Sequence, residues 1–374
     1  MKKFLSGFAA LAVISVTAAF LTGAAPKRTP ARAYVLIEAA TGTVLDGENA
    51  DSPLNVGYLS KLMTILLVGE DIRDGLYSED TVLTASDSVT GTKGSVIWLE
   101  NGDKLSVGEL LKAVAVGNAN DAVTVLAENS AGSVEGFVDR MNARAFDLGL
   151  RNTAFYSPYG YYDEREHSSA HDIALICAEL YRLDLPYFSI WRDFVCNGTV
   201  ELVSENTLTR TYSRHCGFKA AHSDASGCCI AEGGKSGDTC YISVVLGAET
   251  ADDSFSLAKE LIGTGFSDFK LTSANLPDDV LRPVTVKNGE KSAVRVRLEC
   301  QEGIVVPSCT DKLMSRAVLP EHLTAPVESG QRVGTVGFWC GKELVSEQPI
   351  VAAESIDRVT LGFVLRKLLG YAME

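Results

Sequence analysis

The hydrophobic pattern of this chain changes near Leu271, and that change limits the possible folds more than any other feature. Before it, strand-like segments alternate with long helix-like segments. After it, short alternating strands such as residues 333–338 are separated by Gly, Asn and Pro. A chain of 374 residues has room for two domains. We therefore predict an α+β domain over residues 30–270 and a small all-β domain over residues 271–357.

Local signals place the elements of the first domain. Residues 33–38 read as a strand that enters a hairpin through a Thr-Gly turn. Residues 57–70 contain no helix breaker and read as a buried helix, and Ser106-Val-Gly-Glu is a capping box that predicts a helix start. A second hairpin is predicted from the apolar runs 228–231 and 241–246. Further helices are predicted at 121–131, 134–147 and 255–263.

The N-terminus carries the pattern of an export signal. Met1-Lys2-Lys3 is basic, residues 4–25 are apolar and end in small residues, and Pro26 follows. We predict a signal peptide over residues 1–25 that directs the body outside the cytoplasmic membrane. An uncleaved single anchor is the alternative, and it gives the body the same location.

The other end of the chain favours contact with a membrane surface. Residues 358–374 place Leu361, Val364, Leu365, Leu368 and Leu369 on one side of a predicted helix. The segment is too short to span a bilayer but suits an amphipathic helix lying in the membrane surface. A helix packed on its own domain is the alternative.

Charge excludes one class of partner. The chain has 48 acidic against 34 basic residues and a net charge of −14, whereas a phosphate backbone selects a basic surface. We therefore predict no nucleic acid partner.

Several short stretches match the pattern of one enzyme family. They are Ala39-Ala-Thr-Gly-Thr-Val-Leu, Lys61-Leu-Met-Thr, Asn120-Asp-Ala, Leu148-Gly-Leu-Arg-Asn-Thr-Ala-Phe and Ser157-Pro-Tyr-Gly. From about Ala31 to its C-terminus the chain resembles the low-molecular-mass penicillin-binding proteins, the serine-type D-alanyl-D-alanine carboxypeptidases. The resemblance implies a serine β-lactamase/transpeptidase-like domain, with helices around an antiparallel sheet, followed by a β domain and an amphipathic anchor.

The chemistry of that family needs three motifs, S-x-x-K, S-x-N and K-T-G. A serine hydroxyl attacks the peptide carbonyl, and the lysine one helical turn later takes its proton. The second serine relays a proton to the leaving group. The last lysine, on an edge strand, holds the terminal carboxylate of the substrate, while backbone N–H groups stabilise the oxyanion.

The first motif departs from this pattern. Lys61 matches the base, but Tyr58 stands at the nucleophile position. Ser60 precedes Lys61 directly, and neighbours on a helix lie about 100° apart, so Ser60 is not expected to face the same pocket. The phenol of Tyr58 is one candidate for an alternative nucleophile. The other interpretation, which we favour, is an aromatic ring that fills a disused pocket.

The other two motifs are also altered. The second reads Asn118-Ala-Asn120 and keeps only the asparagine, while the third reads Lys219-Ala220-Ala221 and keeps only the lysine. Lys219, Ala220 and Ala221 are the predicted substrate-binding positions. Lys61, Asn120 and Lys219 either shape a cationic, amide-lined cleft for a peptide carboxylate or are structural relics. A family arginine that helps bind the carboxylate corresponds to Ser254 here.

Other segments fit the motifs in a relaxed form. Ser256-Leu-Ala-Lys259 fits the first, Ser204-Glu-Asn206 and Ser273-Ala-Asn275 fit the second, and Lys235-Ser-Gly237 fits the third. All except Lys235 fall in the wrong segments. Lys235 lies in a predicted hairpin turn, so Lys219 is the favoured match.

No cofactor and no metal site are predicted. The chain has no CxxC pair, which disfavours a structural zinc site. His167 and His171 have i, i+4 spacing with Glu164 and Glu166 nearby, which would suit a metal if the segment were helical. The family pattern instead places a helix N-cap near Ser168-Ser169, so a polar loop is favoured.

Three functional hypotheses follow. The favoured one is an exported, catalytically impaired family member that binds peptidoglycan stem peptides or envelope proteins at the outer face of the cytoplasmic membrane or in the cell wall. The second is an active carboxypeptidase that trims the terminal D-Ala and uses Tyr58 or Ser60 as nucleophile. The third is a scaffold whose cleft binds nothing.

Overall fold

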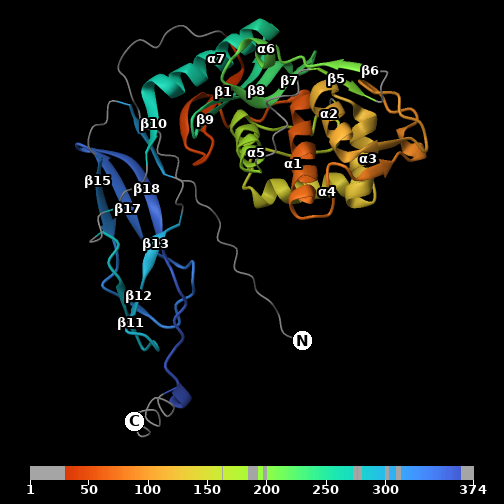
Figure 1. Cartoon of the computed structure of the whole chain (residues 1–374). Helices are drawn as coiled ribbons and strands as arrows, with labels where there is room; N and C mark the ends of the chain where they lie inside the picture. Colours follow the sequence, from red (N-terminus) through yellow and green to blue (C-terminus); the bar gives the residue numbers. More distant parts are fainter. Residues whose placement is uncertain are drawn as a thin grey trace. The chain divides into compact units, whose positions relative to one another are not determined.

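The computed structural model describes residues 30–161, 163–183, 193–196, 200–272, 276, 280–299, 303–308 and 313–363. The chain divides into two compact units, Met1–Ser267 and Asp268–Glu374 (Figure 1). The predicted signal peptide lies outside the described residues.

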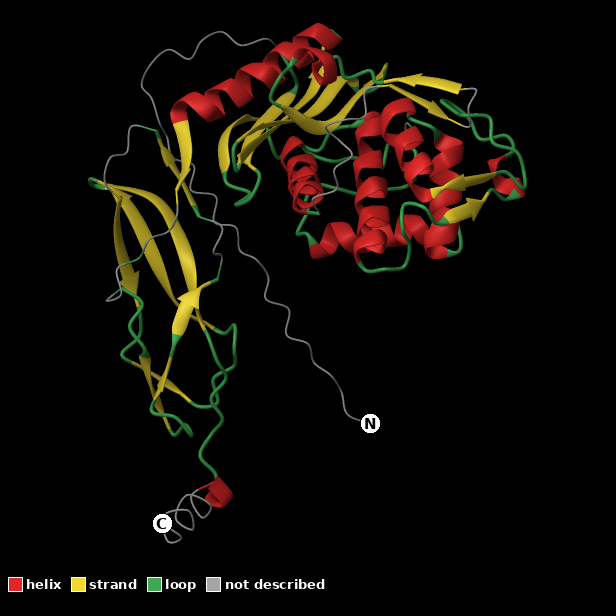
Figure 2. Ribbon diagram, in the orientation of Figure 1, coloured by secondary structure: helices red, strands yellow, loops and turns green. Residues whose placement is uncertain are grey.

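The first unit is built on an antiparallel five-stranded sheet with the order β2-β1-β9-β8-β7. Every residue of the interior strand β1, which lies between β2 and β9, is buried because helices cover both faces of the sheet (Figure 2). Both predicted hairpins are confirmed, one formed by β1 and β2 and the other by β8 and β9. The strands are β1 (Ala33–Glu38), β2 (Val44–Glu48), β7 (His215–Ser223), β8 (Gly227–Ser236) and β9 (Thr239–Ala248).

Helices pack on the two faces of this sheet. One face carries α7 (Ala251–Asp268), and α1 and α5 lie on the other (Figures 1 and 2). The predicted capping box is confirmed, because Ser106 Oγ accepts from the backbone of Glu109 and the Glu109 carboxylate accepts from the Ser106 backbone. The remaining helices are α1 (Lys61–Arg73), which follows the 3-10 turn η1 (Gly57–Ser60), α2 (Val107–Gly117), α3 (Asn120–Ala131), α4 (Val134–Asp147), α5 (Ala170–Arg182) and the short α6 (Leu208–Thr211).

Two small hairpins and a 3-10 turn complete this unit. They are β3 (Val82–Thr84) with β4 (Lys104–Ser106), β5 (Asp193–Cys196) with β6 (Val200–Val203), and η2 (Asp87–Val89).

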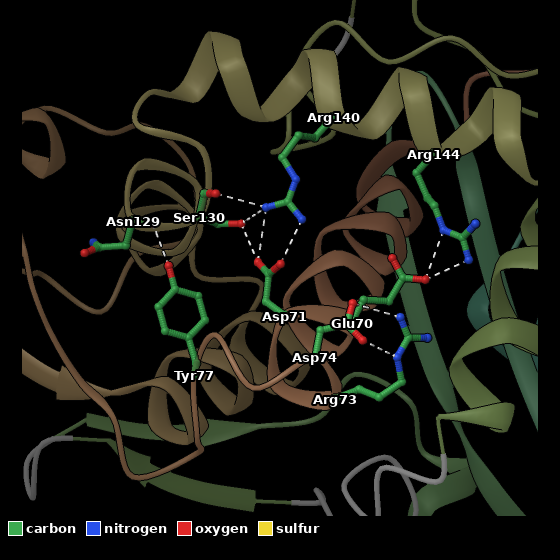
Figure 3. A network of polar contacts seen from close by, with 9 residues as sticks. All are labelled: Glu70, Asp71, Arg73, Asp74, Tyr77, Asn129, Ser130, Arg140 and Arg144. Carbon is green, nitrogen blue, oxygen red and sulfur yellow. Dashed lines mark hydrogen bonds and ion pairs between the residues drawn. The ribbon is translucent and has the colours of Figure 1, made fainter. Parts of the chain in front are cut away.

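Helix α1 lies in the centre of the helical layer, and every residue from Lys61 to Asp71 is buried. Its C-terminal end is fixed by ion pairs (Figure 3). The Asp71 carboxylate accepts from the two terminal nitrogens of Arg140, at 2.9 and 3.1 Å, and from Ser130 Oγ at 2.6 Å. The Glu70 carboxylate accepts from Arg144 at 2.7 Å. These contacts join α1 to α3 and α4.

The second unit consists of strands in the described residues up to Ala352, which confirms the predicted all-β domain. Strand β15 alternates between half-buried and exposed residues because only one of its faces packs on the core. The sheets are β13-β18-β17-β15, β12-β11-β16 and β10-β14. Their strands are β10 (Phe269–Thr272), β11 (Val284–Lys287), β12 (Ala293–Val294), β13 (Val296–Leu298), β14 (Ile304–Pro307), β15 (Leu313–Val318), β16 (His322–Thr324), β17 (Arg332–Cys340) and β18 (Glu343–Ala352).

The predicted helix over residues 358–374 lies mostly outside the described residues, which include only a helical turn at 361–363 in this segment. Among the helices in the described part of the chain, none has the length and apolar character needed to cross a bilayer.

Candidate active site

The three motif positions come from separate elements that meet at one edge of the sheet. Tyr58 lies in η1, and Lys61 is the first residue of α1. Asn118 and Asn120 flank the junction between α2 and α3. Lys219 lies on the edge strand β7, which packs against η1. The fold therefore brings together side chains that are separated by up to about 160 residues in the sequence.

The amine of Lys61 is fully buried and already has neighbours. Its Nζ donates a hydrogen bond of 2.5 Å to the backbone carbonyl of Tyr159, and it lies 4.4 Å from the centre of the Tyr58 ring. Burial lowers the pKa of Lys61 well below its ordinary value, and the positive charge of Lys219 lowers it further. The charges of Glu166 and Glu205 oppose this shift.

Ser60 is buried, and its Oγ has no hydrogen-bond partner among the described residues. The loop that carries Tyr159 closes over it, because a Cβ at Gly160 would lie 2.7 Å from Ser60 Oγ and 2.4 Å from the Gly57 carbonyl. In the described part of the chain, no serine hydroxyl forms a hydrogen bond with the Lys61 amine.

Two amide oxygens at the helix junction lack donors. Asn118 ends α2 in the left-handed conformation, with φ of 57°, which asparagine tolerates better than most residues. Asn120 Nδ2 donates to the Lys93 carbonyl at 2.7 Å and to Tyr161 Oη at 3.2 Å. Among the described residues, no donor reaches the Oδ1 atom of Asn118 or of Asn120, and both atoms are buried. A ligand N–H or O–H group therefore reaches them only if neighbouring side chains move.

Lys219 is buried against the end of α2. Its Nζ donates to the carbonyls of Val114 and Ala115 at 3.1 and 3.0 Å, where the helix dipole favours a cation. Burial lowers the pKa of Lys219 to about 8, and the charge of Glu205 opposes this shift. The next two residues, Ala220 and Ala221, are buried and offer no polar side chain.

The alternative matches to the motifs lie elsewhere. Lys235 is exposed near the end of β8, and its amine lies over the ring of Tyr181. Ser256 and Lys259 are exposed on α7, and Asn206 is buried with its Nδ2 bonded to Glu232. Residues 273–275 lie outside the described part. Ser254, at the position of the family arginine, is buried and bonds the Ala251 carbonyl.

The two histidines with i, i+4 spacing do not share a helix. His167 pairs with Ala154 in a β-bridge, whereas His171 lies in the first turn of α5 and contacts Asp51 at 2.9 Å. Ser169 is the N-cap of α5, which confirms the cap predicted at Ser168-Ser169. Within the described ranges, no cluster of three or more His, Cys, Asp or Glu side chains is arranged to hold a metal ion.

The tyrosines of residues 159–161, the segment that covers Lys61, were not predicted as part of the site. The rings of Tyr159 and Tyr161 lie 5.0 Å apart, and Tyr161 Oη donates to the Lys93 carbonyl at 2.5 Å. Glu166 holds this segment in place by accepting from the backbone of Ser157 at 3.1 Å, and burial raises its pKa to about 7. The signal in the sequence was the tyrosine-rich continuation of Ser157-Pro158.

An antiparallel sheet flanked by helices, with a lysine at a helix start and another on the edge strand, defines the penicillin-binding, transpeptidase-like fold. The family model described as D-alanyl-D-alanine carboxypeptidase matches residues 21–250. A second model, described as the C-terminal domain of penicillin-binding protein 5, matches residues 266–358. The chain belongs to the D-alanyl-D-alanine carboxypeptidase family.

Individual relatives agree with this assignment. The chain is 28% identical to the D-alanyl-D-alanine carboxypeptidase DacF of Bacillus subtilis, over 91% of this chain and 89% of the relative. It is 31% identical to DacC of Escherichia coli, over 87% and 84% of the two chains. The crystal structure of penicillin-binding protein 5 from Haemophilus influenzae superimposes with a TM-score of 0.79 at 27% identity, covering 90% of this chain and all of the other.

Proposed function

We propose that this protein is an exported cell-envelope member of the carboxypeptidase family that binds peptidoglycan stem peptides, or an envelope partner, with strongly impaired hydrolysis. One observation carries the proposal. The neighbours of the Lys61 amine are the Tyr58 ring and the Tyr159 carbonyl. Hydrolysis would need the hydroxyl of an attacking serine beside this amine instead. Losing a nucleophile typically removes several orders of magnitude of rate.

The same geometry disfavours Tyr58 as a substitute nucleophile. The Lys61 amine lies over the Tyr58 ring, 4.4 Å from the ring centre, and its hydrogen bond goes to the backbone carbonyl of Tyr159. A general base must reach the proton that it removes, within about 3 Å. In the described part of the chain the buried oxygens of Asn118 and Asn120 have no donor, so a peptide N–H group that enters the helix junction would find free acceptors there, which supports binding without cleavage.

Labelling with a fluorescent penicillin tests for a working nucleophile. Acylation requires an activated hydroxyl, so we expect no stable adduct on this chain under conditions that label the Escherichia coli relative DacC. Ser60→Ala is the matched variant, and its labelling is expected to equal that of the wild type. An adduct mapped by mass spectrometry to Tyr58 or Ser60 would establish the active-enzyme alternative instead.

Restoring the serine alone is not expected to restore the enzyme. Tyr58→Ser supplies a hydroxyl, but Asn118 still replaces the proton relay and Ala220-Ala221 still replace the third motif. We expect release of D-Ala from a pentapeptide by this variant to stay well below that of the relative. Turnover equal to the relative would show that the second and third motif positions are wrongly assigned.

Titration with a stem pentapeptide separates binding from a purely structural role. Saturable binding is expected, and its loss in Asn120→Ala would place the peptide at the helix junction. A pentapeptide that does not bind at millimolar concentration would favour the scaffold.

The amphipathic segment 358–374 is proposed to attach the protein to the outer face of the cytoplasmic membrane. Co-sedimentation with vesicles of phosphatidylglycerol tests this attachment. Removing residues 358–374 should abolish sedimentation, and sedimentation of the shortened chain would contradict it.

A further inference from the structure

A hollow of about 270 Å³ opens beside the candidate active site. Two segments line the hollow. One is the loop at residues 88–93, and the other is the tyrosine segment, residues 159–161, which covers Lys61. The described side chains that form its wall include three hydroxyls, one ammonium and two aromatic rings: Ser88, Thr90, Thr92, Lys93, Tyr159 and Tyr161.

The two tyrosines are held by bonds that leave only their rings for a ligand. Tyr161 Oη donates to the Lys93 carbonyl, and Tyr159 Oη lies 3.0 Å from Thr124 Oγ1. Their rings are tilted by 34° and lie 5.0 Å apart. Because the phenol oxygens already have partners, the wall offers aromatic surface rather than free hydroxyls at this side.

Tyr159 also separates the hollow from the buried lysine. Its backbone carbonyl accepts the hydrogen bond of Lys61, while its side chain belongs to the wall of the hollow. Lys61 itself is fully buried and is not among the lining residues. A ligand in this hollow therefore contacts the tyrosine segment without reaching the lysine amine.

The chemistry of the wall selects one class of ligand. A phosphate group is bound best by several cations or by an arginine fork, and Lys93 is the one cationic residue among those that line the hollow. An extended peptide needs the backbone of a strand edge, whereas this wall is a loop and two rings. A sugar ring packs its C–H face on an aromatic side chain and exchanges hydrogen bonds with serine and threonine hydroxyls.

We propose that this hollow binds an N-acetylated sugar ring of the glycan strand that carries the stem peptides. The choice of an amino sugar rests on the proposed function, which the inference deepens. The sugar would be held beside the site by Tyr159, Tyr161 and the threonine hydroxyls, and the attached peptide would extend towards the helix junction.

The probe is tri-N-acetylchitotriose, which contains the sugar without any peptide. Its binding to the full chain is measured by ligand-observed saturation-transfer NMR and by calorimetry. We expect saturable binding that is weakened about tenfold or more by Tyr161→Ala and roughly threefold by Thr92→Val, which removes one hydroxyl without changing the side-chain shape.

Tyr156→Ala is the matched control. Tyr156 is an exposed tyrosine of the same loop, but its ring stacks on Arg165 at 4.2 Å and does not line the hollow. We expect its chitotriose affinity to equal that of the wild type. Thermal melts check that each variant folds, and if Tyr161→Ala does not fold, Thr92→Val decides the result.

Two outcomes would overturn the inference. One is the absence of saturable chitotriose binding to the wild type, and the other is equal weakening by Tyr156→Ala and by the variants of the hollow. A stem pentapeptide titrated in parallel keeps the two proposals apart. Peptide binding without chitotriose binding rejects the sugar site alone, and chitotriose binding without peptide binding rejects the stem-peptide proposal alone.

Discussion

The two ends of helix α1 differ in whether their buried charged side chains form ion pairs. At the C-terminal end, the carboxylates of Glu70 and Asp71 are each bonded to an arginine of α4, and Ser130 adds a third donor to Asp71 (Figure 3). At the N-terminal end, the Lys61 amine bonds a neutral carbonyl and lies against an aromatic ring, with the cation of Lys219 as a further neighbour.

This difference separates a structural cluster from a site with binding potential. Paired charges that satisfy each other's hydrogen bonds hold three helices together and leave little for a ligand. A buried cation without a carboxylate partner is held at a cost, because burial favours its neutral form. In the part of the chain that the structure describes, the end without ion pairs is also the end where two amide oxygens have no donor. A ligand can therefore add more hydrogen bonds at the N-terminal end of α1 than at the C-terminal end.

The largest effect is expected at the paired end. Arg140→Met leaves the buried Asp71 carboxylate with Ser130 as its remaining side-chain donor, so we expect the free energy of unfolding to fall by about 3 kcal/mol in urea denaturation. Arg73→Ala is the control, because Arg73 and Asp74 form an exposed pair whose loss should cost less than about 0.5 kcal/mol. Equal losses would mean that the Asp71 cluster contributes no more than a surface pair.

A smaller effect is expected from the second lysine at the unpaired end. Burial lowers the pKa of Lys219 to about 8 from its ordinary 10.5, so between these values the unfolded chain binds more protons than the folded chain. Stability then rises with pH. Relative to Lys219→Met, the wild type should gain about 2 kcal/mol in unfolding free energy between pH 8 and pH 10. A difference that stays constant across this range would contradict the buried, unpaired state of this amine.

The smallest change in the free energy of unfolding is expected for Lys61→Met. This variant should be more stable than the wild type, whereas Arg140→Met should be less stable. Lys61→Met keeps most of the side-chain volume and removes a buried amine that forms no ion pair with a carboxylate among the described residues. The lost hydrogen bond to Tyr159 offsets part of the gain, so we expect stability at pH 7 to rise by about 1 kcal/mol. Lys61→Ala serves as the control for packing and should destabilise, because it leaves a cavity. A clear loss of stability in Lys61→Met would show that the amine has a stabilising partner.

Much of the fold could be predicted because its signals are local. The capping box at Ser106, the strand at 33–38 and the short strands after Leu271 all depend on residues a few positions apart. A metal site at His167 and His171 required both residues to lie on one helix. Helix α5 begins after its cap at Ser169, so it does not include His167. The hollow beside the site was not predicted, since its two walls lie about 70 residues apart in the sequence.

The sequence by itself determined the family through its resemblance in several short stretches, and the two-domain pattern through its hydrophobic periodicity. It also determined the residue type at each motif position, because each of these features lies in residues close together along the chain. Only the tertiary structure decided what those residues face. Lys61 meets a carbonyl 98 positions away, and Asp71 meets an arginine 69 positions away. Whether a buried charge is paired or unpaired depends on atoms that come together only when the chain has folded, because the free energy of a charge is set by its surroundings and not by its neighbours in sequence.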